Sequence, residues 1–332
     1  MTIEVLRPGL LSTLQDRGRF GYQRYGVVVD GAMDEISHRV ANLLVGNDAD
    51  DATLELTLQG PELLFAQECV IALAGAEMEM KSAGARIPMY RPVWIAAGAR
   101  VKFGAARAGC RAYLSVAGGY AVAPVLGSRS TYLPGAIGGH EGRALHAGDV
   151  LLVGQNALDR VESIRRANAF GQCGFAAARW FVAPPVDLHG SSPMRVIPGR
   201  SWKIFGADAR NAFLGTAFRI GAQSDRMGYR LEGAEPALAH RIDLISEATS
   251  FGSVQVPPDG KSIVLMADRQ TTGGYPKIAE VIGADLPRLA QRRPGEVIRF
   301  EAIALDSAQA LLLQQHAALS RLCDAARARW NE

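Results

Sequence analysis

The sequence predicts a mainly β protein built from two related barrel-like halves, with a few short helices and one helix at the C-terminus. Three observations support this fold class. The 332 residues include 36 glycines and 16 prolines, both of which favour tight turns. Most of the chain consists of short apolar runs bounded by such turn residues, which is typical of β-strands. Motifs of the N-terminal half also recur in the C-terminal half at a nearly constant separation.

The strands are expected where apolar runs of about strand length lie between turn residues. A glycine precedes three of the expected strands by one to three residues, and we expect a hairpin or barrel corner at Gly98, Gly148 and Gly295. The clearest runs cover residues 68–74, 92–96, 100–103, 112–116 and 149–153.

Three helices are expected. The first runs from Asp34, a plausible N-cap, to Gly46, and places apolar residues on one face. A second is expected over residues 277–282, because Pro276 is suited to a helix start and Gly283 to a helix end. The third and longest occupies residues 306–330, which are rich in Ala, Leu and Arg with helically spaced leucines.

The repeated motifs suggest a tandem duplication. Pro198-Gly199 follows Pro8-Gly9 by 190 residues, and Gly295 follows Gly98 by 197. A slowly growing offset is typical of a diverged duplication with small insertions, although chance matching of common glycines is the alternative. The Pro- and Gly-rich stretch 184–193 indicates a boundary. The expected domains are residues 1–190, residues 191–302 and a helical tail over 303–332.

Composition excludes several classes of protein. The formal net charge is only +3 and no run of basic residues concentrates it, which argues against nucleic-acid binding. No apolar run reaches the roughly 18 residues of a membrane span. The N-terminus lacks the basic head and apolar stretch of a signal peptide. The four cysteines have no metal-ligand or disulfide spacing, so we expect buried thiols in a cytoplasmic protein.

Charged residues gather in the C-terminal half, where a small anion or carboxylate site is expected. Asp268 and Arg269 follow an apolar strand directly, so the arginine is suited to a carboxylate and the aspartate to orienting it or accepting a proton. If Pro276 opens a helix, the glycine turn before it lies at the positive helix end. Strand-end ion pairs are the structural alternative. The remaining candidates are Asp225, Arg226, Arg230, Gln255, Thr271, Thr272, Gly273, Gly274, Tyr275 and Lys277.

A second candidate region is the long glycine-dense loop over residues 118–143. Ser128, Arg129, Ser130 and Arg143 are suited to binding an anion, and an arm that binds a partner protein is the equally weighted alternative. His140 and His146 do not form a recognised metal pair, so no metal site is expected. The sequence also lacks a Walker A motif and the Gly-x-Ser-x-Gly elbow of serine hydrolases.

Four segments carry a family resemblance. They cover residues 31–47 (GAMDEISHRVANLLVGN), 126–149 (LGSRSTYLPGAIGGHEGRALHAGD), 224–233 (SDRMGYRLEG) and 254–282 (VQVPPDGKSIVLMADRQTTGGYPKIAEVI). The sequence resembles the allophanate-hydrolase-subunit-2 family, also called the KipA or biotin-dependent carboxyltransferase-like family. The resemblance spans most of the chain, in the family's order, and excludes the tail after residue 302.

The resemblance implies tandem cyclophilin-like β-barrel subdomains and a heteromeric complex with a subunit-1-like (KipI-like) protein, the B subunit. It implies a role as the C subunit of an ATP-dependent 5-oxoprolinase that opens the lactam of 5-oxoproline to L-glutamate, in which the A subunit is needed for the complete reaction. ATP with Mg²⁺ is then expected in the complex, and no biotin on this chain. Within it we expect Asp225, Asp268 and Arg269 to be catalytic and the other candidates to bind substrate or anions.

Two other functions stay open on the sequence alone. One is a non-catalytic module that binds and regulates a KipI-like partner. The other is a carboxyltransferase component that acts on a urea-like amide, since cyclic amides and ureas present a similar planar N–C=O edge.

Overall fold

The computed structural model describes residues 1–154, 173–236 and 244–331. These residues divide into two compact units. Unit 1 comprises residues 1–18, 34–188 and 319–332, and unit 2 comprises residues 19–33 and 189–318. The predicted domains 1–190, 191–302 and 303–332 stay a prediction. The compact units differ from them by placing residues 19–33 in unit 2 and the end of the chain in unit 1.

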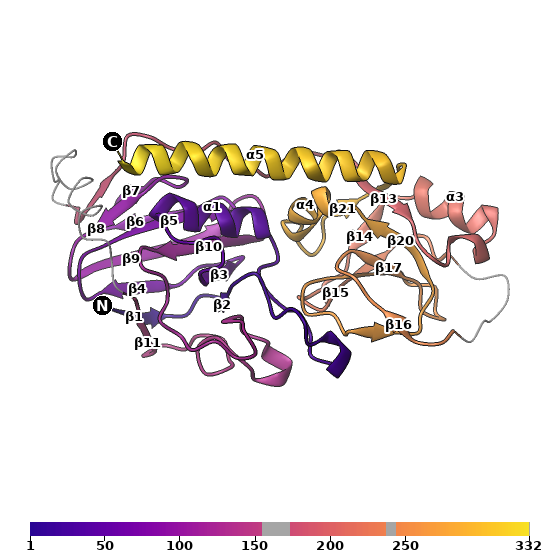
Figure 1. The fold of residues 1–332 in the computed structure, drawn as a ribbon, viewed down its shortest axis with the longest axis horizontal. Coiled ribbons are helices and arrows are strands. Elements are labelled where there is room, and N and C mark those ends of the chain that lie inside the picture. Colours follow the sequence, from indigo (N-terminus) through magenta and orange to yellow (C-terminus); the bar gives the residue numbers. More distant parts are fainter. Residues whose placement is uncertain (155–172, 237–243, 332) are drawn as a thin grey trace. The chain divides into compact units, whose positions relative to one another are not determined.

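Unit 1 contains two six-stranded sheets and a buried helix (Figure 1). Its helix is α1 (Glu35–Val45), and it contains the short 3-10 turn η2 (Leu133–Gly135). The 3-10 turn η1 (Gln23–Tyr25) precedes α1 in the chain but belongs to unit 2. The strands are β1 (Thr2–Arg7), β2 (Leu11–Gln15), β3 (Thr53–Thr57), β4 (Glu62–Phe65), β5 (Cys69–Gly75), β6 (Met78–Ser82), β7 (Ala85–Ile87), β8 (Val93–Ile95), β9 (Ala99–Ala106), β10 (Arg111–Val116), β11 (Val150–Leu152) and β12 (Phe175–Ala177).

The two sheets of unit 1 have the orders β11-β1-β4-β9-β6-β7 and β12-β8-β5-β10-β3-β2, with antiparallel neighbours. Their inner faces share one apolar core that includes Leu54, Phe65 and Leu114, all fully buried. Helix α1 packs against β5 and β10 and buries its apolar side there. The side chain of Asp34 accepts a hydrogen bond from the Ser37 amide and so caps the helix start, while Gly46 ends it in the left-handed conformation with φ 74°.

Unit 2 is organised around an eight-stranded sheet of order β21-β14-β15-β18-β17-β20-β13-β22, with a two-stranded piece β16-β19. Its strands are β13 (Met194–Pro198), β14 (Phe218–Ile220), β15 (Gly228–Glu232), β16 (Glu247–Ala248), β17 (Ser253–Gln255), β18 (Ile263–Leu265), β19 (Thr272–Gly273), β20 (Lys277–Val281), β21 (Val297–Ile298) and β22 (Phe300–Ala302). Its helices and 3-10 turns are η3 (Trp202–Ile204), α3 (Ala207–Gly215), η4 (Gly283–Asp285) and α4 (Leu286–Ala290).

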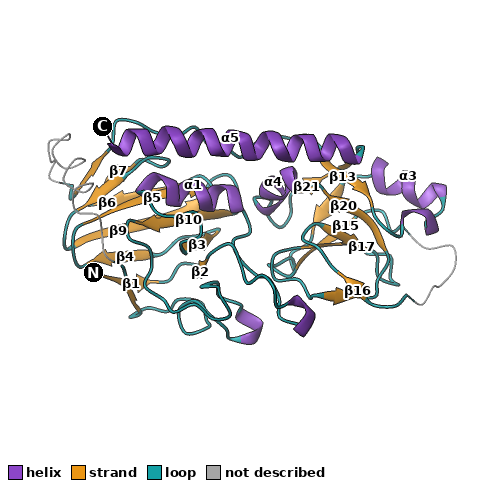
Figure 2. Ribbon diagram, in the orientation of Figure 1, coloured by secondary structure: helices purple, strands orange, loops and turns teal. Residues whose placement is uncertain are grey.

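The core of unit 2 is separate from that of unit 1 and is centred on aromatic packing. The ring of Phe213 on α3 stacks on that of Phe300 with centroids 4.7 Å apart, and Phe218 packs against both. The last helix, α5 (Leu305–Asn331), is the longest of the described helices (Figure 2). Its residues to 318 belong to unit 2 and those from 319 to unit 1.

These elements confirm a mainly β fold with few short helices and a C-terminal helix. All five apolar runs named above form strands. The glycines of the expected corners have positive φ, at Gly98 (77°), Gly148 (91°) and Gly295 (89°). The helices expected over residues 34–46 and 306–330 are present as α1 and α5.

The helix expected after Pro276 was a wrong prediction, because residues 277–281 form strand β20. This strand lies inside the sheet, between β17 and β13, and buries Ile278, Ala279 and Val281. Pairing on both sides and burial on both faces decide its conformation over the local helix-start signal. The glycine turn at residues 273–274 therefore does not lie at a helix start.

Candidate functional site

Two polar clusters of unit 2 and two of unit 1 contain most of the predicted site residues. The first is centred on Arg226, which lies in the turn before β15. Its Nε is 3.0 Å from Oδ2 of Asp268, and its second guanidinium nitrogen is 2.8 Å from Oδ1 of the same carboxylate. That nitrogen also lies 2.8 Å from Asp30 Oδ1 and donates to the Gly31 carbonyl at 2.6 Å. All these side chains are buried, so the arginine joins two aspartates in a low-dielectric environment.

Asp30 is the member of this cluster that the sequence analysis missed. Burial raises the pKa of Asp30 well above its usual range, the nearby Asp268 raises it further, and Arg226 opposes the rise. Arg19 approaches the other Asp30 oxygen at 3.6 Å, and both side chains are fully buried. The residue also has φ 62°, in the left-handed region. The Asp-Gly pair at 30–31 signals only a turn, and 196 positions separate Asp30 from its arginine.

The second cluster surrounds Lys277, the first residue of β20. Its ammonium is 3.0 Å from Oε1 of Glu247 and donates to the Ala248 carbonyl. The other Glu247 oxygen accepts from Arg200 at 2.8 Å. Lys277 is only 5% exposed, so its ammonium is largely removed from water. The Glu247 carboxylate balances its charge.

Gln255 lies opposite Lys277 in the β17–β20 register, and its side-chain amide has an unused hydrogen-bond donor. Its Nε2 is buried and has no hydrogen-bond partner among the described residues. Gly273 on β19 lies against this amide, because a Cβ there would come within 2.6 Å of Nε2. A buried donor without a partner is costly in free energy. The amide is therefore suited to meeting an acceptor supplied by a ligand.

Arg269 lies next to Asp268 but does not pair with it. One of its terminal nitrogens lies within 3.4 Å of the Met266 and Ala267 carbonyls, and the guanidinium is 5.9 Å from the centre of the Phe251 ring. Burial lowers the pKa of Arg269, against the effect of the nearby Glu280. The side chain is therefore a partly buried cation that rests on an aromatic ring.

The other predicted residues of unit 2 have more peripheral positions. The Asp225 carboxylate accepts from the amides of Met227 and Gly228 at 2.8 and 3.2 Å, which braces the turn before β15. Arg230 is exposed on β15. Thus the structure brings Arg226 together with Asp268, across the two motifs, and leaves Asp225 in a turn.

The segment 271–275 crosses the second cluster. Thr272 and Gly273 form β19 and pair with β16, and the Thr271 carbonyl accepts from the Thr249 amide at 3.0 Å. Gly274 is half-buried and Tyr275 is exposed. This segment therefore contributes backbone and Gly273 beside Gln255, while the Tyr275 ring faces solvent.

In unit 1, Ser128 and Arg129 are organised by Asp16, another residue that the sequence analysis missed. The Asp16 carboxylate accepts from the hydroxyls of Ser128 and Ser130 at 2.7 and 2.6 Å, and from the Arg129 and Gly18 amides at 2.5 and 2.8 Å. The hydroxyl that we expected to bind an anion is thus donated to an aspartate of the chain itself.

Arg143 has a similar arrangement. Its two terminal nitrogens hold Asp149 at 2.7 and 2.8 Å, and one of them also contacts Glu141 at 2.7 Å. This bidentate pair holds the pKa of Asp149 well below its usual range. Ser128, Arg129 and Arg143 therefore brace the glycine-dense loop, and their role in binding anions stays a prediction.

Comparison with known proteins identifies the family. Residues 25–302 match the carboxyltransferase domain family, subdomains A and B. The chain belongs to this carboxyltransferase domain family. The resemblance expected from the four sequence segments is thereby confirmed.

Within the described ranges, no helix combines the length and apolar content needed to cross a membrane, and no group of three or more His, Cys, Asp or Glu side chains is placed to hold a metal ion.

Members of this carboxyltransferase family with curated names resemble the chain over different shares of their length. It is 38% identical to the C subunit of 5-oxoprolinase from Haemophilus influenzae over 309 residues, which cover 93% of the chain and 94% of that protein. The C subunit of Escherichia coli 5-oxoprolinase is 38% identical over 92% of the chain and 93% of its own length. The solved urea amidolyase of K. lactis superposes with a TM-score of 0.83 at 30% identity; it covers 96% of the chain, which spans only 20% of that enzyme.

Proposed function

We propose that the chain is the C subunit of a 5-oxoprolinase, the hydrolase that opens the lactam of 5-oxoproline to L-glutamate. The observation that carries this proposal is the end-to-end similarity to two proteins of that name, each 38% identical and covered over more than nine-tenths of its length. Activity requires ATP together with the A and KipI-like B subunits. Under this proposal the chain contributes part of the site and does not act alone.

The proposed reaction needs groups that the second cluster of unit 2 supplies. A lactam carbonyl is a weak electrophile, and donors aimed at its oxygen stabilise the charge that develops during attack. The unpaired Nε2 of Gln255 is suited to this oxygen, and the ammonium of Lys277 is suited to an anionic part of the substrate. Arg269 is suited to the substrate carboxylate.

Asp268 has a positioning role under this proposal, since its carboxylate is already held by Arg226 on two nitrogens. Such a pair fixes the end of β18 and the backbone from which Arg269 extends. The same positioning role falls to the residues on β15 and in the turn before it, which are Asp225, Arg226 and Arg230. These roles rest on the geometry within unit 2 and on the proposed reaction.

ATP with Mg²⁺ belongs to the proposed complex. The described part of this chain fits it poorly. Gly273 lies in strand β19 instead of a loop at a helix start, and no cluster of three or more metal-ligating side chains is placed among the described residues.

The test is reconstitution of the full chain with the A and B subunits. ATP-dependent release of glutamate from 5-oxoproline is expected only with all three proteins present. In that assay Gln255→Leu should lower kcat/KM at least 100-fold while the complex stays assembled and the melting temperature is unchanged or higher, because the substitution removes a buried donor that has no partner.

Lysine variants provide a matched control. Lys277→Met is expected to lower turnover at least 100-fold, whereas Lys261→Met, at an exposed lysine of the same unit, should leave it unchanged. Full turnover by Gln255→Leu would show that this cluster is not the site. Absence of glutamate release from a verified complex of all three proteins would contradict the proposed function itself.

The family and the K. lactis likeness favour a second function, a carboxyltransferase component that acts on a urea-like amide. The same chain would then support transfer of a carboxyl group from a biotinylated carrier protein to urea. Incorporation of labelled bicarbonate into urea, with no glutamate release in the first assay, would favour this function over the first.

A further inference from the structure

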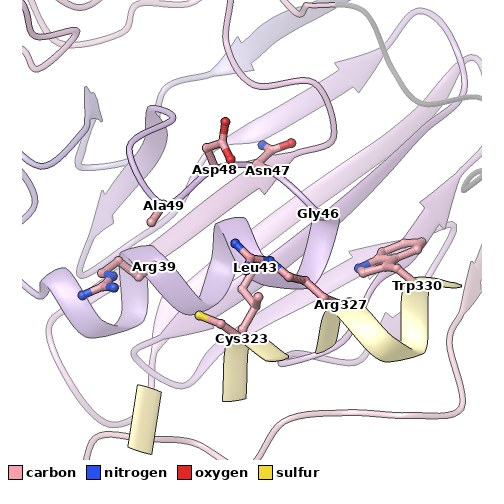
Figure 3. A pocket seen from close by; sticks show the side chains of 9 residues that line it. All are labelled: Arg39, Leu43, Gly46, Asn47, Asp48, Ala49, Cys323, Arg327 and Trp330. Atoms are coloured by element: carbon pink, nitrogen blue, oxygen red, sulfur yellow. The ribbon is translucent and has the colours of Figure 1, made fainter. Parts of the chain in front are cut away.

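A cavity of about 330 Å³ lies in unit 1, where helix α1 ends and the last turns of α5 pass (Figure 3). None of its lining residues belongs to the clusters described above. Asn47 and Asp48, just after α1, lie on one side, and Arg327 and Cys323 of α5 lie on the other. The volume suits a molecule of amino-acid size.

The cavity contains one cation and one anion, Arg327 and Asp48, that no ion pair with a described residue neutralises. Arg327 forms no ion pair with any described residue, and the Asp48 carboxylate accepts no hydrogen bond from one. The Nε of Arg39, which also lines the cavity, is buried without a partner among the described residues. Its guanidinium is 3.6 Å from Glu35, a carboxylate already engaged by Arg17 at 3.1 Å. Arg327 and Asp48 thus line one small space without forming an ion pair with each other or with another described residue.

The other walls favour an organic ligand with a positive group. Trp330 presents an indole whose ring is held edge-on against Trp180, with centroids 6.0 Å apart. Leu43 adds an apolar surface. Gly46 caps α1, so the carbonyl end of that helix, with its partial negative charge, adjoins the cavity on the same side as Asp48.

We propose that this cavity binds a free α-amino acid. The ligand carboxylate pairs with Arg327, with Arg39 at the rim, and the ligand ammonium lies toward Asp48 and the carbonyl end of α1. Its side chain packs on Trp330 and Leu43. A polyanion such as a nucleotide is disfavoured, because Asp48 and the helix end repel negative charge. The proposal concerns unit 1 and is independent of the reaction proposed for unit 2.

The first test is calorimetric titration of the full chain, without ATP or partner proteins, with L-glutamine and L-phenylalanine. Each is compared with its analogue that lacks the amino group, glutaramate or 3-phenylpropionate, and with inorganic phosphate. At least one amino acid should bind tenfold or more tightly than its analogue and than phosphate. Equal affinity of the analogue, tighter binding of phosphate, or no binding of either amino acid at 10 mM would overturn the proposal.

Variants then locate the site. Arg327→Ala and Asp48→Asn should each weaken binding at least tenfold, and both residues are exposed, so the fold is retained. Arg321→Ala, at an exposed arginine of the same helix that does not line the cavity, is the matched control and should bind as the unmodified chain does. Unchanged binding by Arg327→Ala would place the amino acid elsewhere.

The reactivity of Cys323 offers a measurement of binding that is independent of calorimetry. Cys323 lines the cavity and is half-buried, as is Cys173, which does not line it. A saturating amino acid should slow alkylation of Cys323 by iodoacetamide at least threefold, measured by peptide mass spectrometry, and leave Cys173 unchanged. Equal rates at Cys323 with and without the bound ligand would contradict its placement in this cavity.

Discussion

His38 shows how one buried side chain links local hydrogen bonding to the stability of the protein. Its Nε2 is 3.1 Å from the Ala49 carbonyl and its Nδ1 is 2.9 Å from the Thr53 hydroxyl. A carbonyl only accepts, so the neutral ring carries its proton on Nε2 and accepts from Thr53 on Nδ1. Complete burial lowers the pKa of His38 to about 4, although the Ala49 carbonyl opposes this.

This pKa predicts a pH dependence of folding. The unfolded histidine titrates near pH 6.5, so between about pH 6.5 and pH 4 the unfolded chain binds the proton that the folded chain refuses. The contribution of neutral His38 to the free energy of unfolding should therefore be complete well above pH 6.5. The free energy of unfolding should fall by about 2 to 3 kcal/mol by pH 4.5. Urea denaturation at pH 7.5, 5.5 and 4.5 measures the fall.

His38→Gln is the control, because glutamine keeps a donor and an acceptor and does not titrate. The fall between pH 7.5 and pH 4.5 should be smaller in this variant by the same 2 to 3 kcal/mol. Identical pH profiles of the two proteins would show that His38 is not held neutral.

At this scale, sequence reasoning identified residue types and motifs better than partners. Arg226 and Asp268 were both predicted, and the structure pairs them with each other. Asp30 was not, because its contact spans 196 positions and its local sequence reads as a turn. Gln255 was a candidate, yet its unpaired amide depends on how β17, β19 and β20 meet, which no spacing in the sequence reveals.

Helix α1 depends on how it begins. The Asp34 carboxylate accepts from the Ser37 amide at 3.0 Å and from the Ser37 hydroxyl at 2.6 Å, so it satisfies a donor that the first helical turn leaves free. Asp34→Ala should lower the free energy of unfolding by about 1 to 2 kcal/mol, whereas Asp34→Ser, which keeps an acceptor, should recover most of it. Thermal and urea denaturation of both variants measure this difference, and an unchanged stability of Asp34→Ala would show that the cap contributes nothing.

The elements that were predicted and those that were not differ in how locally they are determined. Helix α1 has a cap at each end and an apolar face, and α5 has a long regular pattern, so both are legible in the sequence. Pro276 is a helix-start signal just before residues 277–281, but these residues pair with β13 on one side and β17 on the other. Helix α3 buries only Phe213, so its pattern is too weak to predict it.

At the scale of the whole molecule, the described residues form two apolar cores, one in each unit, which predicts that damage to one stays local. Phe213→Ala, which removes a fully buried ring stacked on Phe300, should cost about 3 to 5 kcal/mol. Hydrogen exchange should rise in peptides of β13, β14 and β22 and remain nearly unchanged in β5 and β10. The reciprocal variant Leu114→Ala should show the opposite distribution, and equal acceleration in both units by either variant would contradict two separate cores.

The tandem β architecture was predictable at this scale, because the glycine and proline content and the repeated glycine corners both indicate it. The glycine pairs behave unequally, however. Gly98 and Gly295 share a positive φ, whereas Gly9 has φ 77° and Gly199 does not adopt a positive φ. Allocation of residues 19–33 to unit 2 was not predictable, since it depends on which side chains meet after folding.

That allocation has a consequence for how the protein is made. Residues 19–33 leave the ribosome early, but the arginine that neutralises Asp30 is synthesised 196 residues later. At about 5 to 20 residues per second, the early segment waits roughly 10 to 40 s for its partner. Unit 1 is therefore translated almost entirely before residues 19–33 can meet their partners in the rest of unit 2, and neither unit is encoded by one uninterrupted stretch of the message.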